Sequence, residues 1–249
     1  MTIRKIIGGA QDLIKVENVL VSVYDKTGLE LFIRELMDVN PSVRFLSTGG
    51  TYKYIDGFLK NSEKDHLMEV SNYTGFPEME GGLVKSLHPK IHAGLLGERN
   101  NPHHQRYLRE ELNGGVFIDM AVVNLYPFGQ VARKVESNEI DPATGSPYNF
   151  ESARGNIDIG GPAMIRAGAK NFLGCAVVCD PHIYDIIQNH LRENNGSTSL
   201  DMRLGLALKT FEVTAAYDAS VVDYLRRSVG SDHGEIKKLY LGGEDVEGN

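Results

Sequence analysis

Short, almost purely apolar runs alternate with helical runs through most of this chain, and this alternation most constrains its fold. The run at 18–24, NVLVSVY, is apolar nearly throughout, as expected of a strand buried on both faces. The next run, at 27–39, places Leu29, Phe32 and Leu36 on one face of a helix. Strands that alternate with helices form parallel sheets with helices on both faces, so the sequence predicts an α/β fold.

The same patterns locate the remaining elements. We expect further strands at 42–47, 66–73, 117–126 and 174–180, and further helices at 51–59, at 103–112, from 161 and from 181. Beyond about residue 200 the pattern is helical. We therefore expect an N-terminal extension over 1–17, one domain over 18–230 with helices in its C-terminal part, and a loosely held tail over 231–249.

The composition argues against some classes of function. The net charge of −7 over 249 residues is unlike the basic excess of proteins that grip nucleic acid, although one local basic pocket suffices for a small anion. No run of about 18 apolar residues and no secretory start occur, so no membrane helix is predicted. Cys175 and Cys179 are too far apart on a strand for a disulfide and lack zinc spacing. They predict core residues of a reduced, cytoplasmic protein without a metal.

The stretch RFLSTGGTYKYI carries the first candidate binding site. A predicted strand ends at Thr48, Gly49 and Gly50 follow, and Thr51 opens a helix. Backbone N–H groups at such a turn attract an anion, and glycine lets it approach closely. An ordinary strand–helix turn with a threonine cap fits the same residues equally well.

Other candidates stand where neighbouring strands end. Ser22 ends the first strand, Lys26 follows at the start of the next helix, and Asn124 and Tyr126 end the strand at 117–126. Because the carboxyl ends of parallel strands share one edge of a sheet, these side chains are expected near the same ligand. A solvated surface lysine is the simpler interpretation of Lys26 alone.

The loop at 75–97, GFPEMEGGLVKSLHPKIHAGLLG, is long for a plain connection, and long ordered loops tend to be functional. Lys85 and Ser86 offer a cation and a hydroxyl together. His88 and His92 suggest a metal or acid–base role, but His88 beside Pro89 fits a packed loop histidine better.

The stretch NIDIGGPAMIRAGAKN at 156–171 has the highest density of candidate functional residues in the chain. Asp158 precedes Gly160 and Gly161, and Lys170 lies two to three turns into the helix that follows. Asp158 as a helix cap and Lys170 as a solvated residue form the simplest interpretation. The helix is rich in small and apolar residues, however, so we expect Lys170 to be buried and to need a partner, for which Asp158 is a candidate.

These motifs resemble the inosine monophosphate cyclohydrolase domain of the bifunctional purine-synthesis enzyme. The resemblance runs from about Val19 to Arg227 and rests on SVYDKTGL, STGGT, VSNYTGFPEM, VKSLHPKIHAGLL, VVNLYPF, NIDIGGPAMIRAGAKN, VVCDPHIYD and LALKTFEVTAAYDA. It implies a three-layer α/β/α sandwich with a Rossmann-like parallel sheet of the methylglyoxal synthase-like type. The family's formyltransferase half is missing here, which implies that a separate protein supplies the substrate.

The implied reaction closes 5-formamidoimidazole-4-carboxamide ribonucleotide (FAICAR) to inosine monophosphate (IMP) with loss of water. By motif, Lys85, Tyr126, Asp158 and Lys170 match the family's catalytic positions. Asp158 coupled to Lys170 would accept the amide proton, Lys85 would stabilise the formyl oxygen, and Tyr126 would orient the formyl group. The implied contacts to phosphate and ribose come from Lys26, Thr48, Gly49, Gly50, Thr51 and Ser86, and Gly160 and Gly161 would supply backbone donors near the base. Ser22 and Asn124 remain substrate-binding candidates from their places at strand ends. No metal or organic cofactor is implied.

Two departures from the family pattern stand out. The family has Gly-Arg-Val-Lys where this chain has Leu83 in place of the arginine. The segment 129–155 is longer than is usual and carries Arg154 beside the active motif. We expect Arg154, or less readily Arg133, to supply the missing guanidinium.

Two other functions stay open. A nucleotide-binding regulatory module would keep the pocket and lose turnover, for which Leu83 is the motive. Methylglyoxal synthase would need its own carboxylate base and has no use for NLYPF or IRAGAKN. The resemblance also implies a cytoplasmic homodimer whose C-terminal helices are plausible interface material.

Overall fold

The computed structural model describes residues 9–77, 79, 84–229 and 234–241. The chain divides into two compact units. The first comprises the described parts of Met1–Leu125 and Ile159–Val213, and the second those of Tyr126–Asp158 and Thr214–Asn249.

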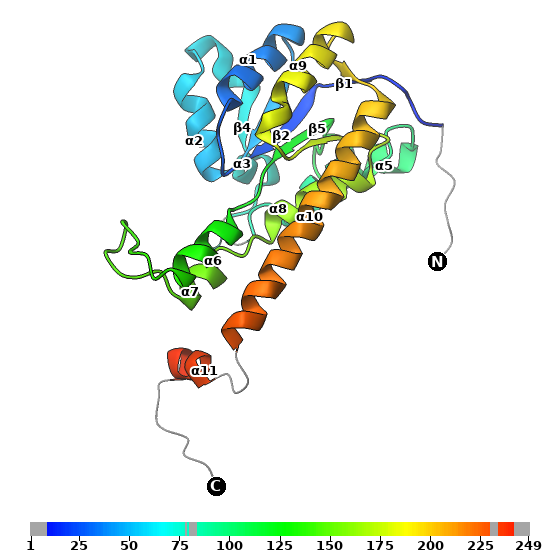
Figure 1. The fold of residues 1–249 in the computed structure, drawn as a ribbon. Coiled ribbons are helices and arrows are strands. Elements are labelled where there is room, and N and C mark those ends of the chain that lie inside the picture. The colour runs from blue at the N-terminus through cyan, green and yellow to red at the C-terminus, as the bar shows by residue number, and fades with distance from the viewer. Residues whose placement is uncertain (1–8, 78, 80–83, 230–233, 242–249) are drawn as a thin grey trace. The chain divides into compact units, whose positions relative to one another are not determined.

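The first unit is built on a five-stranded parallel sheet (Figure 1). Its strands are β2 (Asn18–Ser22), β3 (Arg44–Ser47), β4 (Leu67–Glu69), β5 (Met120–Val123) and β6 (Ala176–Val178). They lie in the order β4-β3-β2-β5-β6, so the chain adds strands on one side of β2 and then on the other. This order confirms the α/β class and puts a topological switch point between β2 and β5, where ligands of such sheets bind beyond the carboxyl ends.

The side chains of each central strand alternate between two hydrophobic layers. Val19 and Val21 of β2 belong to one core cluster, and Leu20 belongs to the other. The first cluster is covered by α1 (Leu29–Val39), α2 (Gly49–Phe58) and α9 (Tyr184–Glu193). The second is covered by α3 (Val70–Thr74), α4 (Pro89–Leu96) and α8 (Gly160–Lys170). The sheet is thus the middle layer of three, as expected.

The smaller elements of this unit connect or edge the sandwich. They are the antiparallel pair β1 (Ile14–Lys15) and β7 (Ser197–Thr198), the turns η1 (Asn61–His66), η3 (Tyr107–Glu111) and η4 (Pro181–Ile183), and α5 (Pro102–Arg106). The helix α10 (Leu200–Val229) begins in this unit and continues into the second.

Several expected boundaries shift in the structure. The strand expected at 66–73 is only three residues long, because Val70 already begins α3. The helix expected from Thr51 begins at Gly49. Lys170 is exposed, so the expectation that it is buried is wrong: α8 turns Met164, Ile165 and Ala169 inward and leaves Lys170 on its outer face.

The second unit has its own small aromatic core. It contains α6 (Phe128–Glu136), α7 (Phe150–Gly155), the C-terminal part of α10 and α11 (Gly234–Leu241). Phe128, Ala132, Ala153 and Tyr224 are buried together. The tail expected to be loosely held contains α11, whose Tyr240 ring contacts Phe150 of α7.

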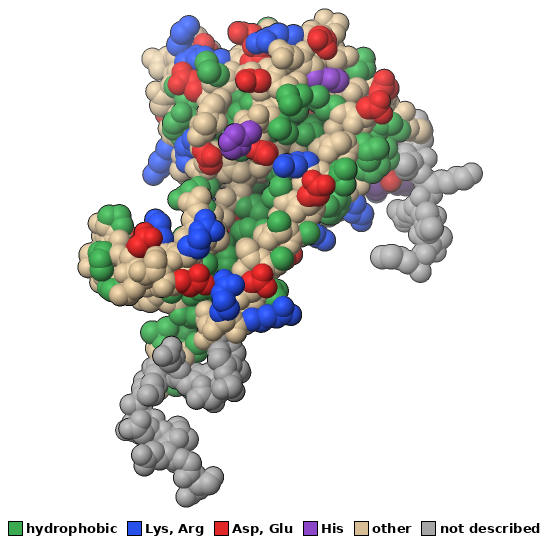
Figure 2. Space-filling model, viewed as in Figure 1, with side chains coloured by type: hydrophobic (Ala, Val, Ile, Leu, Met, Phe, Trp, Pro, Cys, Tyr) green, Lys and Arg blue, Asp and Glu red, His purple; other side chains and the backbone are tan. Residues whose placement is uncertain are grey.

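None of the described helices has the length and apolar composition needed to cross a membrane. On the face of the first unit that Figure 2 shows, Lys and Arg side chains are interspersed with Asp and Glu. Cys175 and Cys179 flank β6 and are buried, which confirms their prediction as core residues.

Candidate active site

The amino end of α2 forms the centre of the candidate site in the first unit. Gly49 and Gly50 open this helix, and their backbone N–H groups have no hydrogen-bond partner among the described residues. Gly49 has a φ of +38°, a conformation that favours glycine. Two unpaired N–H groups at the positive end of a helix can bind an anion directly.

Lys85 lies against this helix end. Its Nζ is 2.7 Å from the position that a Cβ of Gly49 would occupy. The ammonium is therefore next to Gly49, in space that a Cβ at this position would occupy. A lysine at a helix amino end adds a full positive charge to that of the helix dipole.

Ser86 makes the corresponding approach to α8. It is buried, and its Oγ lies closer than 3.0 Å to where a Cβ of Gly160 would be. Gly161 is buried in the first turn of the same helix. The neighbouring residues Lys85 and Ser86 thus join the glycine-bearing amino ends of α2 and α8.

The hydroxyls of Ser22 and Thr48 meet at the ends of β2 and β3. Their oxygens are 2.7 Å apart, and Thr48 is buried while Ser22 is half-buried. Only one of the two hydroxyl hydrogens lies in this bond, so the pair keeps one donor. The pair therefore lies at the carboxyl ends of β2 and β3, with Thr48 directly before Gly49 in the chain.

Two other residues predicted to contact the ligand, Thr51 and Asn124, are hydrogen-bonded within the protein. Thr51 Oγ1 accepts from Val23 N–H and donates to Val23 O, both at 3.0 Å, which uses its only donor. Asn124 Oδ1 accepts from Tyr24 N–H at 2.7 Å, and its Nδ2 donates to Asp25 O at 2.7 Å.

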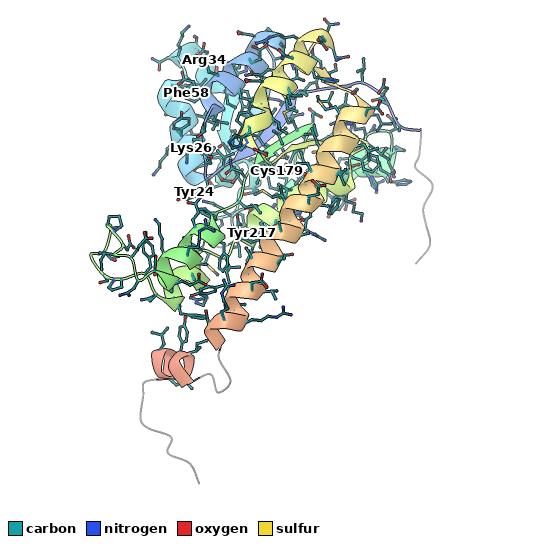
Figure 3. The ribbon with its side chains drawn as sticks, in the orientation of Figure 1. Tyr24, Lys26, Arg34, Phe58, Cys179 and Tyr217 are labelled. Atoms are coloured by element: carbon teal, nitrogen blue, oxygen red, sulfur yellow. The ribbon has the colours of Figure 1, made fainter. Side chains whose placement is uncertain are left out.

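Lys26 turns back onto the same loop. Its Nζ donates to Tyr24 O at 3.2 Å, and Figure 3 shows Tyr24 and Lys26 close together on the segment after β2. Thr51, Asn124 and Lys26 therefore shape the loop that follows β2 in this structure. Their contact with a substrate stays a prediction.

Two histidines support the segment that carries Lys85. His88 caps α4, with Nδ1 accepting from Lys90 N–H at 3.1 Å, which confirms the prediction of a packed loop histidine. The imidazole of His92 hydrogen-bonds to the backbone of Ser86, and its Nε2 is buried without a partner among the described residues. Burial lowers the pKa of both imidazoles, and so favours their neutral forms.

Tyr126 and Asp158 come together in the second unit. The Tyr126 N–H donates to Asp158 Oδ2 at 3.4 Å, and the Tyr126 side chain is 49% exposed. The Asp158 N–H donates to the hydroxyl of Tyr217 at 2.7 Å. Sequence reasoning assigned no role to Tyr217; its one signal was its place in the motif TAAYDA.

Arg154 is held by a neighbour. Its Nε donates to Glu151 Oε2 at 2.7 Å and its Nη2 to the other carboxylate oxygen, while Tyr240 also donates to Glu151. These bonds raise the pKa of Arg154 and lower that of Glu151 to about 2. A role for Arg154 at the substrate would require this pair to open, and Leu83 lies outside the described residues.

The first unit thus combines cationic, N–H and hydroxyl donors that suit a phosphorylated ligand, and the second combines a carboxylate with a phenol. Among the described residues, no group of three or more His, Cys, Asp or Glu side chains is placed to hold a metal ion.

The sequence of this chain is similar to a known protein family and to known proteins. The family model described as AICARFT/IMPCHase bienzyme matches residues 168–245. The bifunctional purine biosynthesis protein PurH of Pelodictyon phaeoclathratiforme is 42% identical over 90% of this chain and 39% of its own length. PurH of Chlorobium phaeovibrioides is 44% identical over 87% of this chain and 38% of its length.

A solved structure is similar over nearly all of its chain. The crystal structure of ForH superposes with a TM-score of 0.65 and 28% identity, over 84% of this chain and 98% of that chain. The chain spans less than two fifths of the length of the curated relatives named above. It is a homologue of part of the bifunctional PurH proteins, and its residues 168–245 match the AICARFT/IMPCHase family model.

Proposed function

We propose that this chain is an IMP cyclohydrolase, which closes FAICAR to IMP with loss of water in purine biosynthesis. The observation that carries the proposal is the pair Lys85 and Ser86, which joins the glycine-bearing amino ends of α2 and α8. The homology to PurH supports an enzyme of purine biosynthesis and, within that class, the cyclohydrolase motifs quoted above favour this activity.

The phosphate of the substrate would bind at the amino end of α2. The N–H groups of Gly49 and Gly50 have no partner there within the described part of the chain, and the ammonium of Lys85 lies beside Gly49. A phosphate placed between them gains charge-assisted hydrogen bonds, each worth about 1.5–3 kcal/mol. The hydroxyls of Ser22 and Thr48 keep one donor for the same ligand.

The chemistry requires two proton movements and one stabilised oxygen. The carboxamide nitrogen attacks the formyl carbon of the same molecule, a C–N bond forms, and the formyl oxygen takes up protons and leaves as water. Because the step is intramolecular, holding the formyl group in its reactive rotamer matters more than bringing two molecules together. The enzyme must also stabilise negative charge on that oxygen.

The residues that match the family's catalytic positions would divide this work. Asp158, coupled to Lys170, would accept the proton of the carboxamide, and Tyr126 would orient the formyl group. Lys85 would stabilise the formyl oxygen and assist its loss as water. Its position beside Gly49 also suits the phosphate, and binding and turnover measured separately would divide the two roles.

A matched pair of lysine variants tests the proposal. The chain is incubated with FAICAR, and IMP formation is followed by ultraviolet absorbance. Lys85→Met should lower kcat/KM by at least about 100-fold, since it removes a charge used in both binding and turnover. Lys53→Met removes the same charge from an exposed position on α2 and should leave kcat/KM within twofold.

Two further arms separate the alternatives. IMP binding without turnover of FAICAR would favour the regulatory module, and release of phosphate from dihydroxyacetone phosphate would favour methylglyoxal synthase. We further propose that the protein acts as a cytoplasmic homodimer and receives FAICAR from a separate formyltransferase. Sedimentation measures the oligomeric state, and a coupled assay with the formyltransferase measures the supply of FAICAR.

A further inference from the structure

The hydroxyl of Tyr217 bridges two backbone groups of the segment that contains Asp158. It accepts a hydrogen bond from the Asp158 N–H at 2.7 Å and donates one to Asn156 O at 3.3 Å. Tyr217 lies 59 positions after Asp158 in the chain, on α10. One phenol thus fixes both ends of a three-residue turn.

This turn sets the direction of the Asp158 carboxylate. Oδ2 of Asp158 accepts a hydrogen bond from the Tyr126 N–H at 3.4 Å. The backbone of Asp158 is therefore held from one side by Tyr217, while its carboxylate is directed toward the backbone of Tyr126. A turn that lost the Tyr217 hydroxyl would lose the hydrogen bonds that this oxygen makes to Asp158 N–H and to Asn156 O.

The phenol of Tyr217 is itself held in place. Its ring packs edge-on against Phe128 with the ring centroids 6.2 Å apart. Burial raises its pKa to about 12, so the hydroxyl keeps its proton at physiological pH and can donate and accept at once. Its role can therefore be removed by deleting the oxygen alone, without disturbing the ring.

We propose that Tyr217 is a positioning residue for the proposed catalytic base: it fixes the turn that aims the Asp158 carboxylate and holds it beside Tyr126. The inference rests on the proposed function, because the orientation of the Asp158 carboxylate matters only if it takes a proton from a bound substrate. Tyr217 itself touches no reacting atom in this scheme.

The same helix offers a matched control. Tyr224 lies two turns further along α10, is buried, and packs edge-on against Phe128 with a centroid separation of 5.6 Å. Its hydroxyl is buried without a hydrogen-bond partner among the described residues. Tyr217→Phe and Tyr224→Phe therefore remove the same atom from the same helix, but only the first breaks the bridge to the turn.

Two readouts separate positioning from general stability. Tyr217→Phe should lower kcat for FAICAR by about 10- to 100-fold with KM within twofold, because a catalytic group displaced by about 1 Å can cost 100-fold. It should also speed amide hydrogen exchange at Asp158, measured by NMR, by about 10-fold or more, since the N–H loses its acceptor. Tyr224→Phe should change neither quantity by more than twofold.

The outcomes are distinct. Equal kcat and equal exchange in the two variants would overturn the inference, and so would a loss in Tyr217→Phe that appears in KM alone. Wild-type protein that does not convert FAICAR would refute the proposed function instead. The exchange rate at Asp158 would then still decide whether Tyr217 holds the turn.

Discussion

The substitution Gly49→Ala isolates the contact between α2 and Lys85. The new Cβ would lie 2.7 Å from Lys85 Nζ, so the ammonium must retreat by about 0.7 Å to reach an ordinary contact. The φ of +38° adds a conformational cost of roughly 1 kcal/mol for any residue with a Cβ. Two separate effects follow, one on stability and one on the ligand.

The ligand effect is the larger and more specific of the two. Displacing Lys85 Nζ from a phosphate removes one charge-assisted hydrogen bond, worth about 1.5–3 kcal/mol, which corresponds to roughly 10- to 150-fold weaker IMP binding. Gly57→Ala supplies the control, because Gly57 lies on the same helix with nothing within 4 Å of its Cβ position. It should leave binding unchanged and raise the free energy of unfolding by roughly 0.5–1 kcal/mol.

Titration calorimetry with IMP at fixed ionic strength measures the effect, and a double-mutant cycle identifies its cause. If Gly49→Ala acts by displacing the ammonium, it should weaken binding very little once Lys85→Met has removed that ammonium. An equal loss of affinity in both backgrounds would refute this reasoning, because the strained backbone of α2 would then be responsible. Wild-type affinity in Gly49→Ala would refute it more directly.

Three further predictions concern residues around the site. Asn124→Ala removes the bonds to Tyr24 N–H and Asp25 O, and should lower the free energy of unfolding in urea by roughly 2 kcal/mol; a loss in IMP affinity without loss of stability would contradict this. Burial lowers the pKa of His88 and His92, so the unfolded chain binds more protons below their ordinary value of 6.5. The contribution of these histidines to the free energy of unfolding should therefore be fully present above pH 6.5. It should fall as the pH drops toward their pKa values in the folded protein, and the fall should be shallower in His92→Gln. Burial also raises the pKa of the Cys175 thiol to about 12, so it should react with Ellman's reagent at pH 8 only in urea, and rapid labelling of native protein would count against its burial.

The strands were the most predictable part of the fold. The runs around β2 and β5 are apolar on both faces because helices cover both sides of the sheet, and that pattern is visible in the chain itself. Their ends were less predictable. The strand expected at 117–126 is Met120–Val123, the four residues that pair with Val19–Ser22 of β2.

The exposure of Lys170 could have been predicted from helical spacing, although α8 as a whole is rich in small and apolar residues. Arg166 and Lys170 are four positions apart and so share one face of α8, whereas the small and apolar residues occupy the other faces. Helical spacing predicts an exposed lysine at this point, although the helix as a whole is mostly buried. An exposed lysine needs no partner within the fold, so the coupling of Lys170 to Asp158 stays a prediction.

Which polar groups remain for a ligand depends on which ones the fold itself uses. The sequence predicts ligand contacts for Thr51 and Asn124 just as it does for Thr48 and Gly49, because all four residues follow closely after β3 or β5. In the structure, Thr51 donates its only hydroxyl hydrogen to Val23 O, and the side-chain oxygen and nitrogen of Asn124 both bond to the loop after β2. Among the residues that the structure describes, none accepts a hydrogen bond from the N–H groups of Gly49 and Gly50, since a helix leaves its first turn without internal partners. Substituting Thr51 should therefore lower the free energy of unfolding more than it weakens ligand binding. A change at Gly49 should weaken ligand binding more than it lowers the free energy of unfolding. The ratio of these two losses separates residues that bind a phosphate from residues that shape its site.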